Sequence, residues 1–168
     1  AQKSGGSLRD SLSIFDRLVD PSDLTLTYKS VIENLNILDH DYYLKITSQI
    51  LDNDVSSVML TINEILSNGF DAHQFIMGLS SHFRDLLVSK DSNTIILLDK
   101  GEELQNKYLA QSEQCNLSFL IKSLQICNNC DVEYRASKNQ RLLVELSLLQ
   151  MATLSQFVAE KKNNNQQI

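Results

Sequence analysis

The sequence contains few residues that interrupt regular secondary structure. Its 168 residues include 5 Gly and 1 Pro. A fold of many short strands needs such residues at its turns, so their scarcity argues against a sandwich or a barrel. Hydrophobic residues make up 42% of the chain and charged residues 21%, which is typical of a globular domain. We therefore predict an all-α fold.

Segments that would direct the chain to a membrane or out of the cell are also missing. No run reaches the roughly 18 consecutive apolar residues that a membrane-spanning helix needs, and no basic segment followed by an apolar one resembles a secretory signal. Three cysteines, an odd number, do not predict a disulfide framework. These absences favour a reduced, cytoplasmic setting.

Positive charge is in short supply as well. The chain has 15 Lys and Arg against 21 Asp and Glu, and its formal net charge is −6. A surface of this overall sign repels the phosphate backbone of nucleic acids, so DNA could bind only at a local basic patch. We expect no strong DNA binding by this chain alone.

Motifs for catalysis or metal binding are absent or weak. There is no glycine-rich phosphate loop, no G-x-S-x-G turn and no HExxH helix. The pair Cys127 and Cys130 has CxxC spacing but lies in a helical pattern without a second pair, which favours ordinary core thiols. His40, His73 and His82 lack the i, i+4 spacing of a helical metal site. We predict no catalytic residue, no metal site and no bound cofactor in this chain.

The pattern of apolar residues and N-capping residues predicts one helix after another. Expected helices begin after the caps Ser7, Asp39, Asp54, Asp71 and Asn116. Others are expected over residues 28–35, over 101–111, and over the segment "NQRLLVELSLLQMATLSQFVA" from residue 139. The segment "TIILLD", Thr94 to Asp99, fits either a strand or a short buried helix, and the helix is favoured because the rest of the chain is helical.

Two of these helices have uneven faces. In the helix after Asp71, Phe75, Leu79 and Phe83 share an apolar face, and Arg84 and Asp85 are expected on the opposite one. In the last helix, leucines point in almost every direction, so it must be covered on more than one side or meet another subunit. The polar tail "EKKNNNQQI" is expected to begin a disordered linker.

Arg9 lies where a positive charge is least favourable. Ser7 and Asp10 form a capping box, so Arg9 falls in the first turn, next to free backbone N–H groups and the positive end of the helix dipole. This placement raises the free energy of the helix by roughly 0.3 to 1 kcal/mol. A negatively charged partner is therefore expected at Arg9.

Three segments resemble one known family, in order along the chain. "SGGSLRDSLSIFDRLV" (residues 4–19) resembles the sensor-2 helix of AAA+ clamp loaders, most closely that of bacterial DNA polymerase III gamma/tau subunits. "DVSSVMLTINEILSNGFDAHQFIMGLSSHFRDLLV" (54–88) and "YRASKNQRLLVELSLLQMA" (134–152) are similar to later helices of the same family. The sequence departs from the family pattern at four positions: Ser11 for Ala, Arg17 for Gln, Gln140 for Pro and Gln150 for Arg.

The resemblance implies a domain order and a role. Residues 1–38 would be the last part of the ATPase lid, 39–158 the helical collar, and 159–168 the start of the linker. The P-loop that binds ATP and Mg²⁺ would lie ahead of residue 1, so this piece itself would not be an enzyme. Arg9 would sense the γ-phosphate. In the family, collars pack into a ring of gamma/tau copies with delta and delta-prime subunits, which loads the sliding clamp in DNA replication in the bacterial cytoplasm.

Four residues of the last helix are candidates for the subunit interface: Arg141, Glu145, Leu146 and Leu149. Arg141 and Glu145 are one turn apart, and both an exposed ion pair and a pair desolvated between subunits remain open. A homo-oligomer is also possible on this sequence. The alternative function is a helical adaptor or oligomerisation domain of another AAA+ protein, outside replication.

Overall fold

The computed structural model describes residues 38–91, 93–98 and 100–164. Side chains are described up to residue 154, except the side chain of residue 96. The chain divides between Asp39 and His40 into two units, and the helices described below belong to the second. The predicted helices after Ser7 and over residues 28–35, with Arg9, lie outside the described residues.

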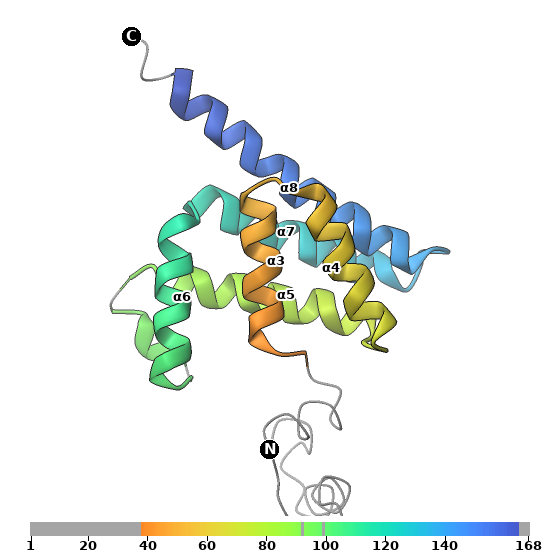
Figure 1. Cartoon of the computed structure of the whole chain (residues 1–168), viewed down its shortest axis with the longest axis horizontal. Helices are drawn as coiled ribbons and strands as arrows, with labels where there is room; N and C mark the ends of the chain where they lie inside the picture. Colours follow the sequence, from red (N-terminus) through yellow and green to blue (C-terminus); the bar gives the residue numbers. More distant parts are fainter. Residues whose placement is uncertain (1–37, 92, 99, 165–168) are drawn as a thin grey trace, which may run out of the picture. The chain divides into compact units, whose positions relative to one another are not determined.

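Helices account for all the regular structure in the described residues, which confirms the predicted all-α class (Figure 1). The helices are α3 (His40–Leu51), α4 (Val55–Ser67), α5 (Ala72–Val88), η2 (Ile95–Leu97), α6 (Glu102–Gln114), α7 (Leu117–Tyr134) and α8 (Gln140–Asn164). The single-turn 3₁₀ helix η2 lies inside the segment that could have been a strand, so the helical interpretation was correct there.

The helices begin at the residues that the sequence indicated. The carboxylate of Asp54 accepts a hydrogen bond from the Ser57 amide at 3.0 Å, and that of Asp71 accepts from the Gln74 amide at 2.8 Å. Asn116 caps α7 in the same way. Each cap satisfies one of the amides that a helix leaves unpaired at its N-terminus.

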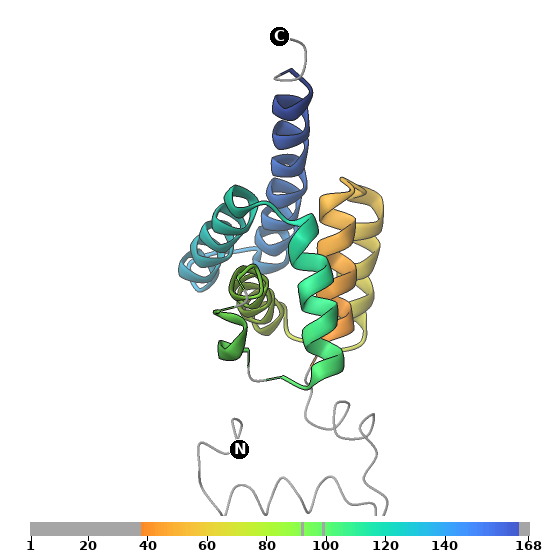
Figure 2. The ribbon, with the colours of Figure 1, turned by 90° about the vertical axis from the view of Figure 1, so that its left-hand side faces the viewer.

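The core lies between the apolar faces of α3, α4, α5, α7 and α8. Figure 2 shows α8 between α7 on one side and the α3–α4 pair on the other, and α8 also packs on α5. The prediction that the last helix is covered on more than one side is therefore confirmed. Its fully buried residues are Val144, Leu148, Met151 and Ala152.

The connection from α5 to α6 is held by hydrogen bonds to main-chain oxygens. The hydroxyl of Thr94 donates to the Val88 carbonyl at 2.6 Å, and the Gln105 amide donates to the carbonyls of Leu98 and Lys100 at 3.1 and 2.9 Å. These contacts fix the end of α5 against the start of α6.

Two local expectations were wrong. Asp85 was expected on the exposed face of α5, but its side chain is only 13% exposed because it pairs with Lys100 from the following connection. The polar linker was expected from residue 159, but α8 continues to Asn164. Ala, Glu and Lys at the start of that segment are good helix formers, so the helix continues through it.

Candidate assembly surface and buried polar network

The last helix keeps a line of leucines in contact with solvent. Leu142 and Leu146 are each 47% exposed, and Leu149 is partly exposed. Their spacing, i, i+4 and i+7, puts them on one face of α8, while Val144 and Leu148 face the core. Of the predicted interface leucines, Leu146 is therefore half exposed and Leu149 less so.

Helix α4 has one further exposed leucine and a polar link to α8. Leu60 is 69% exposed and lies one turn from Asn63, whose side-chain oxygen accepts a hydrogen bond from Nη2 of Arg141 at 3.0 Å. We call Leu60, Arg141, Leu142, Leu146 and Leu149 together the assembly surface. It combines apolar side chains from two helices with one guanidinium group.

The predicted pair of Arg141 and Glu145 forms within α8. Nε of Arg141 donates to Oε1 of Glu145 at 2.8 Å, and the two side chains are 55% and 15% exposed. An exposed pair at this spacing contributes only about 0.2 to 0.5 kcal/mol to stability. Arg141 also donates to Asn63, so it links α8 to α4 as well.

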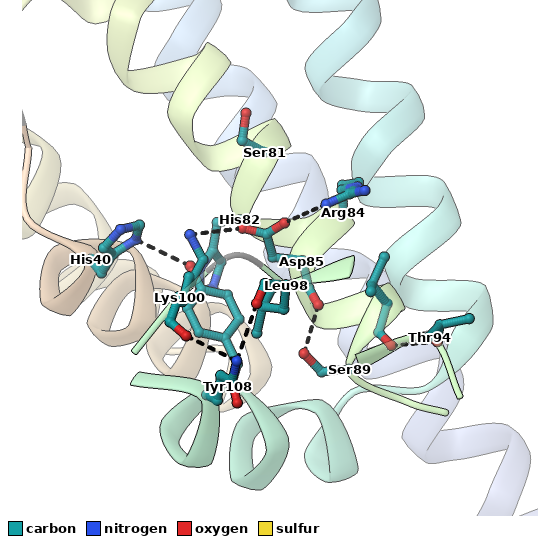
Figure 3. A network of polar contacts seen from close by, with 12 residues as sticks. His40, Ser81, His82, Arg84, Asp85, Ser89, Thr94, Leu98, Lys100 and Tyr108 are labelled. Carbon is teal, nitrogen blue, oxygen red and sulfur yellow. Dashed lines mark hydrogen bonds and ion pairs between the residues drawn. The ribbon is translucent and has the colours of Figure 1, made fainter. Parts of the chain in front are cut away.

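Charged and aromatic side chains meet where α5, the 89–101 connection and α6 come together (Figure 3). The carboxylate of Asp85 pairs with Arg84 at 3.0 Å and with Lys100 at 3.1 Å. The ammonium group of Lys100 also lies over the Tyr108 ring, 5.4 Å from its centroid. The side chains of Lys100 and Asp85 are only 16% and 13% exposed, and a largely desolvated pair of this kind favours a single arrangement of its side chains.

His82 lies at the centre of this region and is 2% exposed. Its Nδ1 is 2.9 Å from the Tyr108 hydroxyl, and its Nε2 is 3.1 Å from Oε1 of Gln111. Burial lowers the pKa of His82 to about 3, so the imidazole is neutral near pH 7. Burial also raises the pKa of Tyr108, which keeps its hydroxyl protonated. These groups therefore form neutral hydrogen bonds inside the bundle.

The two cysteines of the CxxC segment are core thiols, as predicted. Cys127 and Cys130 are 1% and 2% exposed, and burial raises the pKa of Cys127 to about 12. Within the described residues, no three His, Cys, Asp or Glu side chains are grouped so that they could hold a metal ion. None of the described helices is long and apolar enough to cross a membrane.

Comparison with known proteins identifies the family. The model described as "DNA polymerase III subunits gamma and tau domain III" matches residues 26–166. The chain belongs to this family. The match begins ahead of α3 and includes every helix described here, so the assembly surface and the buried network are both parts of domain III.

Several known proteins are similar over most of the chain. DNA polymerase III subunit tau of Bacillus subtilis is 23% identical over 92% of this chain, and subunit gamma of Buchnera aphidicola (Acyrthosiphon pisum) is 23% identical over 90%. Protein STICHEL-like 2 of Arabidopsis thaliana is 24% identical over 99%. The chain spans 28%, 42% and 19% of these three relatives, respectively.

Sequence reasoning missed Leu60 and the buried network, although signals for both were present. Leu60 falls outside the i, i+3, i+4 pattern that places Val58, Ile62 and Ile65 in the core, and an apolar residue off that pattern is a candidate for contact with a partner. His82 lies beside Phe83 on the apolar side of α5, where a histidine needs internal hydrogen-bond partners.

Proposed function

We propose that this chain is the collar of a clamp-loader subunit and holds the loader together during ATP-dependent loading of the sliding clamp in DNA replication. Its partners would be other gamma/tau copies and delta and delta-prime subunits, in the bacterial cytoplasm. The assembly surface carries the proposal, because it is an apolar face of a domain III chain that a neighbouring subunit could cover.

The energetics of the exposed leucines favour this role. Complete burial of one leucine side chain contributes roughly 1.5 to 3 kcal/mol, and Leu60, Leu142 and Leu146 each retain a large exposed fraction. Arg141 is already bonded to Asn63 and Glu145. A partner that covers the guanidinium would therefore have to supply acceptors only for its remaining N–H groups.

We also propose the division of the longer protein. The lid would end near residue 38 and the collar would begin at residue 39, which is supported by the start of α3 at His40 and the division of the chain beside it. ATP and Mg²⁺ would bind to a domain ahead of residue 1, and Arg9 would contact the γ-phosphate. In the full-length protein, Arg9→Ala should impair clamp loading without changing the mass of the assembly; normal loading would refute that role.

The alternative, a helical domain of a protein outside replication, has less support. The similarity to STICHEL-like 2 is compatible with it, because that name does not refer to replication. The family match and the bacterial gamma and tau relatives favour the clamp loader. Absence of any complex with delta-type subunits would favour the alternative.

The test replaces exposed leucines of the assembly surface with arginine. The double variant Leu142→Arg, Leu146→Arg should lower the apparent affinity between the subunits of the reconstituted complex at least tenfold, since about 1.4 kcal/mol of lost burial corresponds to a factor of ten. Sedimentation should then show an assembly of lower mass. The matched control is Leu117→Arg, Ile121→Arg on α7, where the leucine and isoleucine are 55% and 43% exposed.

Folding of both variants is verified by circular dichroism and urea unfolding. If the α8 variant folds and assembles like the unmodified protein, the assembly surface is not the interface. If only the α7 variant dissociates, the interface lies on α7 instead, and the proposal for α8 is likewise wrong.

A further inference from the structure

The hydrogen bonds around His82 form a chain that begins and ends on α3. It passes from His40, the first residue of α3, to Tyr108 on α6, then to His82 on α5 and Gln111 on α6, and returns to Leu44 and Ser48 on α3. We call these six residues the α3 circuit. It links three helices through side chains that are largely buried.

The direction of each hydrogen bond follows from the acceptors at the end of the circuit. The Leu44 carbonyl can only accept, and the Ser48 hydroxyl gives its own proton to that carbonyl at 3.1 Å. The amide nitrogen of Gln111 must therefore donate to both, at 2.8 and 3.0 Å. This leaves Oε1 of Gln111 as the acceptor for His82.

The tautomer of His82 and the orientation of the Tyr108 hydroxyl follow from the acceptor role of Gln111 Oε1. Nε2 of His82 carries the proton and donates to Gln111, so the unprotonated Nδ1 accepts from the Tyr108 hydroxyl at 2.9 Å. The Tyr108 oxygen can then accept from Nδ1 of His40, at 3.3 Å. Both ring nitrogens of His82 and the hydroxyl of Tyr108 therefore have partners in one consistent order of donors and acceptors. Such directional contacts restrict the positions of these side chains more than apolar packing does.

The start of α3 is where the chain passes from residues 1–39 into the helical unit. Beside the circuit, Nζ of Lys107 pairs with Asp41 at 3.0 Å, so the first turn of α3 is attached to α6 at two places. Helix α6 has few apolar side chains, and its buried residues are Tyr108, Gln111 and Ser112. Its attachment to α3 is therefore mainly polar and directional.

We propose that the α3 circuit holds the first two turns of α3 in one orientation and that Tyr108 and His82 are positioning residues through which the preceding segment acts on the collar. This inference rests on the proposed function for its consequence in clamp loading. The segment before α3 is joined to the first turn of this helix through the main chain. It can pass a movement on to the bundle only if α3 moves together with the other helices and does not tilt by itself.

The first test measures the circuit itself. Nitrogen-15 NMR of the His82 ring should show the neutral tautomer with the proton on Nε2. Tyr108→Phe removes the hydroxyl but keeps the buried ring, and it should speed amide exchange in the first two turns of α3 about tenfold, as expected for a lost hydrogen bond of about 1.4 kcal/mol. Amides of α7 should change less.

The matched control is Tyr134→Phe, which removes a hydroxyl from another buried tyrosine, on α7, outside the circuit. It should leave exchange in α3 unchanged. If amide exchange in Tyr108→Phe increased equally over α3 and α7, the hydroxyl would stabilise the whole bundle and not α3 in particular. That result would overturn the proposal. A proton on Nδ1 of the neutral His82 would also overturn it.

The second test uses the full-length protein in its assembled complex. Tyr108→Phe should lower the rate of ATP-dependent clamp loading severalfold while sedimentation shows an assembly of unchanged mass. Unchanged loading in an intact assembly would overturn the positioning role. A complex that fails to form in the unmodified protein would instead count against the proposed function, so the two failures are distinguishable.

Discussion

Acidification should destabilise the bundle through His82 before the carboxylates are protonated. An unfolded histidine has a pKa near 6.5, whereas burial lowers the pKa of His82 to about 3 in the fold. Between these values the unfolded chain binds a proton that the folded one does not, so the free energy of unfolding falls as the pH falls below 6.5. The nearby charges of His40 and Lys100 also lower this pKa, while Gln111 and Asp85 raise it.

The magnitude follows from the two pKa values. From pH 7 to pH 5 the folded state binds almost no proton at His82, and the free energy of unfolding should fall by about 2 kcal/mol. With a urea dependence of about 1–3 kcal/mol per M, the unfolding midpoint should move down by about 1 M. Urea titrations followed by circular dichroism at several pH values between 7 and 5 measure this shift.

The variant His82→Gln provides the reference. It lacks the titrating imidazole, so its stability should be lower at pH 7 but should depend on pH by about 2 kcal/mol less over the same range. The other histidines and the carboxylates contribute equally to both proteins. Equal pH dependence of the two proteins between pH 7 and pH 5 would show that His82 is not a buried neutral group.

Two further predictions concern packing in the core. Gly78→Ala would place a Cβ atom in a steric clash with the Tyr43 hydroxyl oxygen, so it should lower the free energy of unfolding measured in urea by about 1–2 kcal/mol, despite the better helix propensity of alanine. In a Tyr43→Ala background the same substitution should stabilise the protein. A gain in stability with Tyr43 present would contradict the close packing. Because Cys127 and Cys130 are buried and burial raises their pKa values, neither should react with a thiol reagent faster than the bundle unfolds, and rapid modification of the native protein would disprove this.

Local signals in the sequence were sufficient for the helices. Asp54, Asp71 and Asn116 were recognised as caps because each places an acceptor beside amides three residues away, and the structure has all three. The ambiguous segment after α5 was correctly taken as helical because the surrounding chain is helical. In each case the deciding contacts lie within one or two turns of the residue.

The errors and omissions have a common cause. Asp85 was placed on the exposed face because its helix alone does not show that Lys100 will pair with it. For His82, the sequence showed only that the spacing of a helical metal site is absent. Its partners Tyr108 and Gln111 come from α6, which packs on α5 only in the folded chain. Contacts between helices depend on how the helices pack, and the periodicity of a single helix does not contain that information.

The sequence alone determined the helical class, most helix boundaries and the resemblance to the gamma/tau family, because caps, periodicity and motifs depend on residues close together in the chain. The tertiary structure decided which leucines of α8 remain exposed, that Leu60 on α4 is exposed as well, and that Arg141 binds Asn63 on α4. It also gave His82 its partners. Exposure and buried hydrogen bonds are set by neighbours that are distant in sequence, so only the packed bundle fixes them.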